Sequence, residues 1–363
     1  MAAWFAWVAA RSVGRRHDGV GVFAVTADRV LVTGGGGSVG GAVVRALLDR
    51  GTTVRSFSRG TYPALRALGV ETVRGDLADL DAVERAVDGC EAVVHVAAKA
   101  DLSVHAAPFI ATNVVGTANV IAACRRRHVG RLVFTSTPSV VHSGGAIEGA
   151  DESLPYARHH MAHYPATKAR AERLVLSAND TNLMTVAIRP HLVWGTGDGQ
   201  LTARIIERAR SGRLRLVDGG TAIVDATWID DAADAHVRAL AALSAPVAGG
   251  RPVAGRAFFI ASGWPRPIVT LLDGVLAAAG LPPERRSVPF RVAYAAGAAC
   301  ETAWRLARRR DEPPMTRFLA TQLATGHWFD LTAARRDLGY EPGVSPDEGA
   351  RRLAGALSGT APR

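Results

Sequence analysis

The sequence predicts an α/β fold, in which a doubly wound parallel sheet is joined to a smaller C-terminal lobe that binds substrate. Three observations predict it. Short apolar runs alternate with helical patterns along most of the chain, an order that winds into a parallel sheet with helices on both faces. A glycine-rich loop follows the first apolar run. The 363 residues, 48% of them hydrophobic, are enough for one large core plus a lobe.

Residues 1–28 precede the first expected strand and differ from the rest in composition. Residues 1–10 are mostly apolar, and residues 11–18 are basic. A signal peptide places its charge before the apolar run, so this order argues against one. Two interpretations stay open: an arm that contacts a membrane or a partner, or a segment upstream of the functional fold. We expect an N-terminal extension without fixed structure that adds nothing to catalysis.

The first strand and the loop after it predict a nucleotide-binding turn. Residues 30–32 form an apolar run, and a helical pattern begins at residue 42. Strand, glycine turn and helix in this order bring backbone N–H groups and a helix N-terminus toward a diphosphate. The sequence therefore predicts a Rossmann-type turn that contacts a cofactor through Gly34, Gly37, Ser38, Val39 and Gly40.

The next strands and helices continue the alternation. Five further strands are expected at residues 52–57, 71–74, 92–97, 131–135 and 184–188, with helices at 81–87, 113–126 and 165–176. Ligands bind at the carboxyl ends of the strands in such sheets. We expect a cofactor-binding domain at residues 29–190 and a mainly substrate-binding lobe at 191–363, interleaved with the sheet. The Ala-rich segment 290–310 has a basic end and is suited to a lid, a membrane surface or a partner enzyme.

The end of the second strand indicates which cofactor is used. Enzymes specific for NAD place a carboxylate there to hold the ribose 2′-hydroxyl, whereas a 2′-phosphate requires that the acid be absent and a cation be near. The acidic position falls on Ser58, and Arg59 follows it. These residues predict NADP(H). The alternative is that Arg59 is an ordinary surface arginine of an arginine-rich chain.

Tyr164 and Lys168 form the candidate catalytic pair. The chain has 43 lysine and arginine residues, yet lysine stands only at Lys99 and Lys168. Where arginine is the usual cation, a retained lysine indicates a need for a compact ammonium. Residues four apart share a helix face, so the ammonium is expected to favour the ionised phenol and make it a usable proton donor near neutral pH. The same spacing also occurs on ordinary solvated helices, and the glycine loop supplies the context.

Several segments in order resemble the extended short-chain dehydrogenases/reductases, in the branch with 3β-hydroxysteroid and sterol-4α-carboxylate dehydrogenases. Within the branch they look most like bacterial 2-alkyl-3-oxoalkanoate reductases of long-chain olefin biosynthesis. The likeness runs from about residue 29 to about residue 342. The segments that carry it are RGDLAD, HVAAKA, TNVVGTANV, FTSTPSV, YPATKA and RPHLVWGTGD.

The resemblance implies further catalytic residues. Thr137 stands where the family has the hydroxyl that hydrogen-bonds the reacting oxygen, with Ser136 next to it. Asn113 matches the asparagine that helps to fix the lysine, and a helix N-cap is its alternative role.

The resemblance also implies cofactor contacts. Asp76, with Leu77 after it, is placed to bind the adenine amine, although an aspartate there also caps helices. Lys99 either reaches a substrate carboxylate or points to solvent. The remaining implied cofactor contacts are Ala97, Ala98, Pro190 and Val193.

The implied function is NADPH-dependent reduction of a 2-alkyl-3-oxoalkanoate, a fatty β-keto acid, to the 3-hydroxy acid. One alternative is a 3β-hydroxysteroid or sterol-4α-carboxylate dehydrogenase, which shares the catalytic residues. Another is a nucleotide-sensing protein without turnover, against which the set of Thr137, Tyr164 and Lys168 argues, because a sensor needs no proton donor. A homodimer and a complex with other olefin-pathway enzymes are expected as assemblies.

Composition excludes several other classes. The net charge of +10 is spread along the chain without the aromatic-interleaved basic patch of a nucleic-acid binder. Cys90, Cys124 and Cys300 have no metal-ligand spacing, and their odd number favours a reducing cytoplasm. We therefore expect a cytoplasmic protein with no metal, no nucleic-acid partner and no transmembrane segment.

Overall fold

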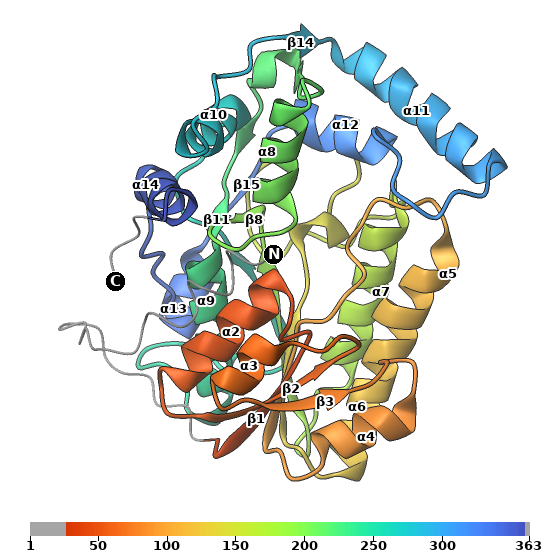
Figure 1. Ribbon diagram of the computed structural model, residues 1–363. Coiled ribbons are helices and arrows are strands. Elements are labelled where there is room, and N and C mark those ends of the chain that lie inside the picture. Colours follow the sequence, from red (N-terminus) through yellow and green to blue (C-terminus); the bar gives the residue numbers. More distant parts are fainter. Residues whose placement is uncertain (1–26, 360–363) are drawn as a thin grey trace.

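A computed structural model describes residues 27–359 and shows a seven-stranded parallel sheet at the centre of the molecule (Figure 1). The strand order is β12-β7-β5-β4-β1-β2-β3, and each neighbouring pair is parallel. The predicted doubly wound α/β fold is confirmed. The strands are β1 (Arg29–Thr33), β2 (Thr53–Ser58), β3 (Glu71–Arg74), β4 (Ala92–His95), β5 (Arg131–Thr135), β7 (Met184–Pro190) and β12 (Arg256–Ile260).

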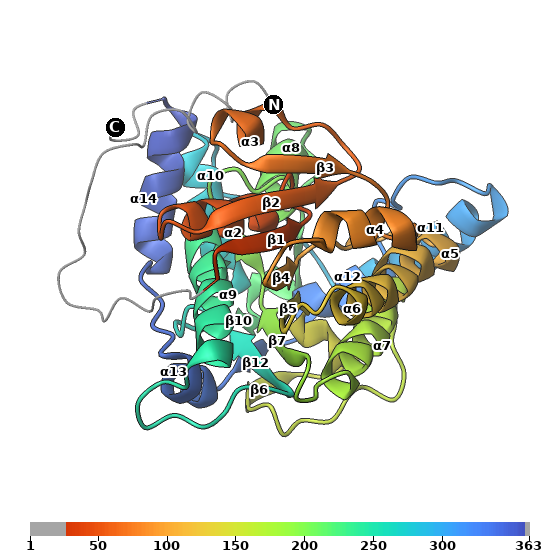
Figure 2. The ribbon, with the colours of Figure 1, turned by 90° about the horizontal axis from the view of Figure 1, so that it is seen from below.

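Two layers of helices cover the sheet, and Figure 2 shows them on opposite faces. Successive side chains of a strand point to opposite faces, so Val30 and Val32 pack in one core while Leu31 packs in the other. One layer contains α2 (Ser38–Leu48) and α9 (Ile229–Ser244). The other contains α4 (Leu80–Val87), α6 (Gly116–Arg126) and α7 (His163–Ser177), and the short α3 (Pro63–Ala67) follows β2.

The structure differs from the sequence prediction at one strand and one helix. Strand β12 was not predicted, and it joins the sheet beside β7. The helix expected from residue 113 begins earlier, as α5 (Ala106–Phe109), the π-helical η1 (Ile110–Val115) and α6 in continuous succession. Asn113 is therefore inside a helix, and the alternative role considered for it, as an N-cap, is wrong. Pro108 lies in the first turn, where a missing N–H costs nothing.

This continuous helix, Ala106–Arg126, is the one helix among residues 27–359 with the length and apolar composition of a membrane span. Its mean hydropathy reaches 1.4 over the most apolar stretch, and 44% of that stretch is buried inside the protein. The helix packs against α4 and α7, as a core helix does.

The C-terminal lobe lies above the carboxyl ends of the strands in Figure 1. It contains a four-stranded sheet of order β13-β10-β15-β6 and two small two-stranded sheets, β11-β8 and β14-β9. Its strands are β6 (Ile147–Ala150), β8 (Val193–Trp194), β9 (Leu216–Val217), β10 (Ile223–Val224), β11 (Thr227–Trp228), β13 (Arg266–Pro267), β14 (Ser287–Val288) and β15 (His327–Phe329). Its helices are α8 (Leu201–Arg210), α10 (Ile268–Ala278), α11 (Phe290–Leu306), α12 (Arg317–Ala324) and α14 (Pro346–Leu357). Helix α13 (Thr332–Leu338) packs against α9 and β12 beside the central sheet. The turns η2 (Pro138–Val140) and η3 (Asp218–Gly220) complete the elements.

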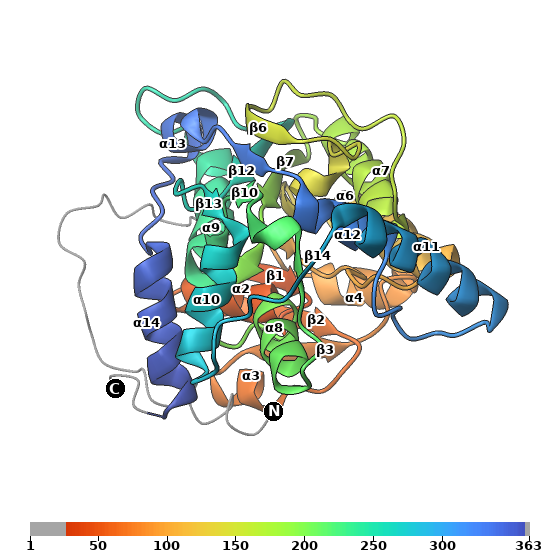
Figure 3. The same ribbon diagram turned by 90° about the horizontal axis from the view of Figure 1, so that it is seen from above.

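Helix α11 lies at the rim of the lobe, as Figure 3 shows, and packs on α12. Gly297 allows the close approach, because a Cβ there would lie 2.5 Å from the Thr316 carbonyl carbon. Glu301 binds the Arg317 side chain at 2.7 Å. Residues 290–306 of the segment 290–310 thus form a helix with one packed face, and Val292 and Leu306 are exposed on it.

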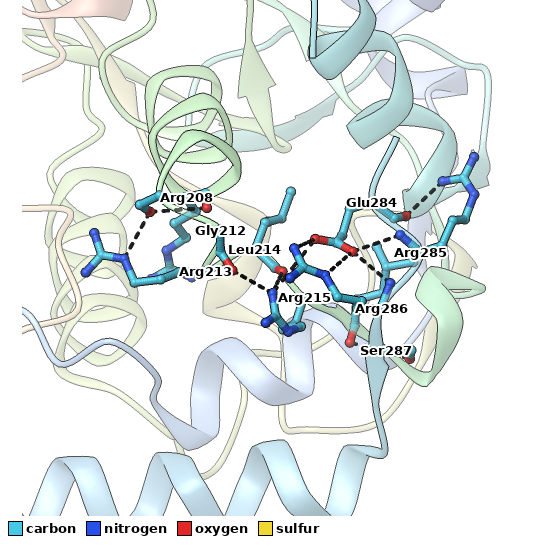
Figure 4. Close-up of polar contacts among 11 residues, drawn as sticks. Arg208, Gly212, Arg213, Leu214, Arg215, Glu284, Arg285, Arg286 and Ser287 are labelled. Atoms are coloured by element: carbon cyan, nitrogen blue, oxygen red, sulfur yellow. Dashed lines mark hydrogen bonds and ion pairs between the residues drawn. The ribbon is translucent and has the colours of Figure 1, made fainter. Parts of the chain in front are cut away.

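Ion pairs organise the loop between α10 and β14 (Figure 4). The Glu284 carboxylate accepts hydrogen bonds from the backbone N–H groups of Arg285 and Arg286 and from the Arg286 side chain, with Oε2 2.5 Å from Nη2. Arg215 contributes a longer ion pair of 3.9 Å to the same carboxylate. These contacts hold β14 next to β9, and several of the basic residues therefore serve the architecture of the lobe.

Candidate active site

A cleft of about 520 Å³ runs along the carboxyl ends of the central strands, between the sheet and the C-terminal lobe. Most residues predicted from the sequence line it. They are Gly34, Gly37, Ser38, Val39, Gly40, Ser58, Arg59, Asp76, Leu77, Ala97, Ala98, Thr137, Tyr164, Lys168, Pro190 and Val193.

The glycine loop is shaped for close backbone approach. Gly34 has a φ of +72°, and a Cβ on it would lie 2.9 Å from the Ala97 Cα. A Cβ on Gly40 would lie 2.1 Å from the Gly34 carbonyl oxygen. Helix α2 begins at Ser38 with no side-chain cap, so its first N–H groups are available to an anion at the positive end of the helix. The loop therefore suits the diphosphate of a dinucleotide.

The end of β2 offers a polar recess beside the main cleft. The Ser58 hydroxyl is buried without a hydrogen-bond partner, and Ser58 and Tyr62 line both spaces. Arg66 and Arg74 line the recess, and Arg74 donates to the Arg59 carbonyl oxygen at 2.9 Å. An unpaired buried hydroxyl in a recess lined by Arg66 and Arg74, with Arg59 next to it in the cleft wall, suits a phosphate ester.

Asp76 lines the cleft at the end of β3. Its Oδ1 accepts the Ala78 N–H at 2.9 Å, which fixes a turn. The carboxylate that caps α4 belongs to Asp79, which accepts the Ala82 N–H at 3.1 Å. Asp76 is thus not the helix cap considered in the sequence analysis, and its Oδ2 makes no hydrogen bond or ion pair with residues 27–359.

Tyr164 and Lys168 both lie on the cleft-facing side of α7. Lys168 is 2% exposed, donates to the Thr135 carbonyl oxygen at 2.5 Å and lies 3.9 Å from the centre of the Phe134 ring. Burial lowers the pKa of Lys168 to about 7, although the Glu172 carboxylate acts in the opposite direction. The lysine therefore exchanges its proton near neutral pH.

The pKa of Tyr164 differs from the expectation drawn from the sequence. Burial raises it to about 12, and a hydrogen bond with the Thr137 side chain opposes this only in part. The expected lowering by the neighbouring ammonium is therefore wrong for the protein by itself, because desolvation of the phenolate outweighs the nearby charges. The phenol carries its proton throughout the neutral range.

Thr137 lies between the end of β5 and the start of η2. Its Oγ1 caps this turn by accepting the Ser139 N–H at 3.3 Å, and it lies 3.0 Å from the Ser139 hydroxyl. Ser136 also lines the cleft, and its buried hydroxyl has no hydrogen-bond partner. Both hydroxyls thus remain candidates for a contact with the reacting oxygen.

Asn113 and Lys99 are the two predicted site residues that the structure does not place in the cleft wall. The Asn113 amide accepts the Lys99 N–H at 2.8 Å and donates to the Thr167 hydroxyl at 3.0 Å, so it supports the helix turn that carries Lys168. The Lys99 ammonium pairs with the Asp101 carboxylate and lies 5.1 Å from the centre of the Phe109 ring. Neither interpretation of Lys99 from the sequence, carboxylate binding or solvent, describes this local pairing.

Sequence reasoning missed several cleft residues. Asp198 accepts the Thr202 N–H at 2.7 Å and so starts α8, and the next residue, Gly199, donates its N–H to the Ser38 hydroxyl at 3.1 Å. This contact brings the loop before α8 against the glycine turn. No local sequence pattern predicts that these two segments meet. The other missed residues are Tyr62, Gly75, Val96, Ala100, Thr112, Thr135, Leu192 and Gln200. Residues 27–359 contain no group of three or more histidine, cysteine or acidic side chains placed to hold a metal ion.

Known proteins match this chain over most of its length. A 2-alkyl-3-oxoalkanoate reductase of Stenotrophomonas maltophilia is 52% identical over 328 residues, 90% of this chain and 98% of that protein. Another, from Shewanella oneidensis, is 43% identical over 350 residues, which are 94% of this chain and 90% of that protein. A 3 beta-hydroxysteroid dehydrogenase/Delta 5→4-isomerase of Mycobacterium tuberculosis is 36% identical and covers 86% of each chain.

Solved structures agree with the fold. A UDP-glucose 4-epimerase of Thermus thermophilus in complex with NAD has a TM-score of 0.67 and 27% identity, and covers 91% of this chain and 99% of that chain. The profile of the 3-beta hydroxysteroid dehydrogenase/isomerase family matches residues 31–290. The chain therefore belongs to the 3-beta hydroxysteroid dehydrogenase/isomerase family, within the extended short-chain dehydrogenases/reductases, and is an oxidoreductase that uses a nicotinamide cofactor.

Proposed function

We propose that this enzyme uses NADPH to reduce the C3 ketone of a 2-alkyl-3-oxoalkanoate to the 3-hydroxy acid, as a step of long-chain olefin biosynthesis. The observation that carries the proposal is the 52% identity to the 2-alkyl-3-oxoalkanoate reductase of Stenotrophomonas maltophilia. The matched residues make up 98% of that reductase. The cleft supports it, because Thr137, Tyr164 and Lys168 lie together at the carboxyl ends of β5 and at the start of α7.

The residues present suit NADPH. The N-terminus of α2 would hold the diphosphate, and the Ser58 hydroxyl with Arg59, Arg66 and Arg74 would hold the 2′-phosphate. When bound, the nicotinamide supplies the hydride. The absence of an acid at Ser58 favours NADPH over NADH, because a carboxylate there would repel the phosphate.

The chain's own contribution is a proton and its placement. Because its pKa lies near 12, Tyr164 carries its proton at neutral pH and donates it to the substrate oxygen as negative charge develops there. The Thr137 hydroxyl donates a hydrogen bond to the same oxygen. Lys168, while protonated, favours the phenolate that remains.

The test runs in the reverse direction, because 3-oxo acids lose CO2 readily. A synthetic 2-alkyl-3-hydroxyalkanoate is supplied with NADP⁺, and NADPH absorbance is followed for several chain lengths. The proposal predicts turnover with at least one length and a slower reaction with NAD⁺. Absence of signal with every chain length, alongside oxidation of a 3β-hydroxysteroid, would assign the enzyme to the steroid branch.

A further inference from the structure

A buried ion pair lies directly behind the catalytic helix. Glu172 on α7 is fully buried, and Arg189 on β7 is 4% exposed. The two form a two-pronged contact, with Arg189 Nη2 2.6 Å from Glu172 Oε1 and Nε 3.1 Å from Oε2. The Tyr156 hydroxyl donates to Oε1 at 2.7 Å. The carboxylate is thus held in one orientation from two other segments of the chain.

Glu172 lies one helical turn beyond Lys168, and Lys168 lies one turn beyond Tyr164. Residues at this spacing share one face of a helix, so the three side chains form a row on α7. Among residues 27–359, no carboxylate comes within ion-pair distance of the Lys168 ammonium, which instead contacts the Thr135 carbonyl oxygen and the Phe134 ring. A buried ammonium with only these contacts loses most of its hydration.

The charged and titratable groups around Lys168 leave Glu172 as the group that favours its proton. His95 on β4 and His236 on α9 are both buried, which lowers their pKa values to about 3 and about 4, so both are neutral near pH 7. Tyr164 is neutral there as well. The Arg189 guanidinium contacts the Glu172 carboxylate.

We propose that Glu172 is a positioning residue that keeps Lys168 protonated, and that Arg189 and Tyr156 hold its carboxylate in place for this task. The inference rests on the role proposed above for Lys168. The alternative is that the ion pair only joins α7 to β7. A buried ion pair is itself weak evidence of a stabilising role, because desolvation of the two charges offsets their attraction. A measurement on Lys168 itself separates the two.

The sequence makes that measurement direct, because lysine occurs only at positions 99 and 168. The full-length protein is prepared with isotope-labelled lysine, and the chemical shift of each side chain is followed by NMR as the pH changes. A Lys99→Arg variant assigns the two signals. Lys99 also serves as an internal reference, since its ammonium pairs with Asp101.

The test variant is the double substitution Glu172→Gln with Arg189→Met, which removes the carboxylate without leaving an unpaired buried guanidinium. We expect the titration midpoint of Lys168 to fall by up to about one pH unit, because the carboxylate that favours its proton is lost. The simultaneous loss of the Arg189 charge offsets part of this shift. Glu172→Asp keeps the charge but moves it back by one methylene group, so it should shift the titration midpoint of Lys168 less and in the same direction. Glu172→Asp is used in place of the double variant if the double variant does not fold.

The control removes another ion pair, between the buried Glu301 and the partly exposed Arg317, neither of which lines the cleft, by Glu301→Gln with Arg317→Met. It should leave the Lys168 midpoint unchanged. The inference is overturned if the titration midpoint of Lys168 stays at the parent value in the double variant, or in Glu172→Asp where that variant replaces it. It is also overturned if the control variant shifts the Lys168 midpoint by the same amount. This readout needs no substrate. A failure to oxidise any 2-alkyl-3-hydroxyalkanoate would therefore overturn the proposed function without altering the NMR result.

In the active enzyme the same double variant should lose activity at lower pH than the parent. Lys168 must keep its proton for the reaction, so the alkaline limb of kcat/KM moves with its pKa. A purely structural pair would lower the amount of folded enzyme and leave the position of that limb unchanged. An unmoved limb in a folded double variant would contradict the catalytic part of the inference.

Discussion

Replacing Arg59 by alanine tests how the enzyme selects its cofactor. Arg59 is exposed at the carboxyl end of β2 and lines the cleft beside Ser58. Its carbonyl oxygen accepts the hydrogen bond from Arg74, and this contact survives the substitution because the backbone is unchanged. Arg59→Ala therefore removes one guanidinium from the proposed phosphate site without dismantling the loop.

The expected loss follows from the contact removed. A hydrogen bond between charged groups contributes about 1.5–3 kcal/mol, which corresponds to a roughly 10- to 150-fold change in Kd. Because Arg59 is exposed to solvent, we expect the lower end, about tenfold weaker NADPH binding. NADH has no 2′-phosphate and should bind as before.

Fluorescence titration with NADPH and NADH measures both constants, and kcat/KM with each cofactor measures the preference during turnover. Arg85→Ala is the matched control, because Arg85 is an exposed arginine on α4 that does not line the cleft. Ser58→Asp should move the preference toward NADH by repelling the phosphate. An unchanged ratio of NADPH to NADH in Arg59→Ala would show that this end of β2 does not select the cofactor.

Three further predictions concern the catalytic lysine, acid stability and the glycine loop. Lys168→Arg should be inactive in the NADPH-absorbance assay, since a planar guanidinium cannot replace a buried ammonium; activity near the parent rate would refute the role given to Lys168. The pKa values of His95, His142 and His236 are lowered by burial to about 3, about 4 and about 4, so the unfolded chain takes up protons first as the pH falls. The free energy of unfolding should therefore decrease as the pH falls below about 6.5. Denaturant titrations at stepwise lower pH measure it, and a constant free energy of unfolding down to pH ~4 would contradict the prediction. Gly40→Ala should abolish cofactor binding in the fluorescence titration, because its Cβ would lie 2.1 Å from a backbone oxygen of the loop; unchanged binding would show that the loop adapts.

The sheet and most of the cleft were predictable because their signals are local. The glycine turn, the apolar runs and the spacing of Tyr164 and Lys168 each depend on residues close in sequence. Strand β12 was missed although it had a local signal, the apolar run Ala257–Ile260, which fits a buried strand. Its pairing with the much earlier β7 is the part that no nearby residue indicates.

The remaining misses depend on tertiary contacts. Lys99 stands two residues before Asp101, and only the fold shows that the two side chains meet outside the cleft. Tyr62 lines the cofactor cleft because its ring packs over Gly36, where a Cβ would lie 2.2 Å from the ring. The raised pKa of Tyr164 reflects the loss of water around its hydroxyl in the folded protein, which a helical spacing does not reveal.

The central claim is that Tyr164 supplies the proton, and Tyr164→Phe tests it most directly. The ring is kept and only the hydroxyl is lost, so NADPH should bind with nearly the parent Kd. The matched control is Tyr340→Phe, which removes a buried hydroxyl that donates to the Ala261 carbonyl oxygen at 2.9 Å, outside the cleft.

The measurement is kcat of Tyr164→Phe, with the Kd of NADPH determined on the same preparation. General acids contribute about 10²- to 10⁴-fold, so the account predicts a kcat lowered by at least about a hundredfold beside an unchanged Kd. The Tyr340→Phe control should keep most of its activity. A Tyr164→Phe enzyme that retains more than about a tenth of the parent kcat would contradict the account.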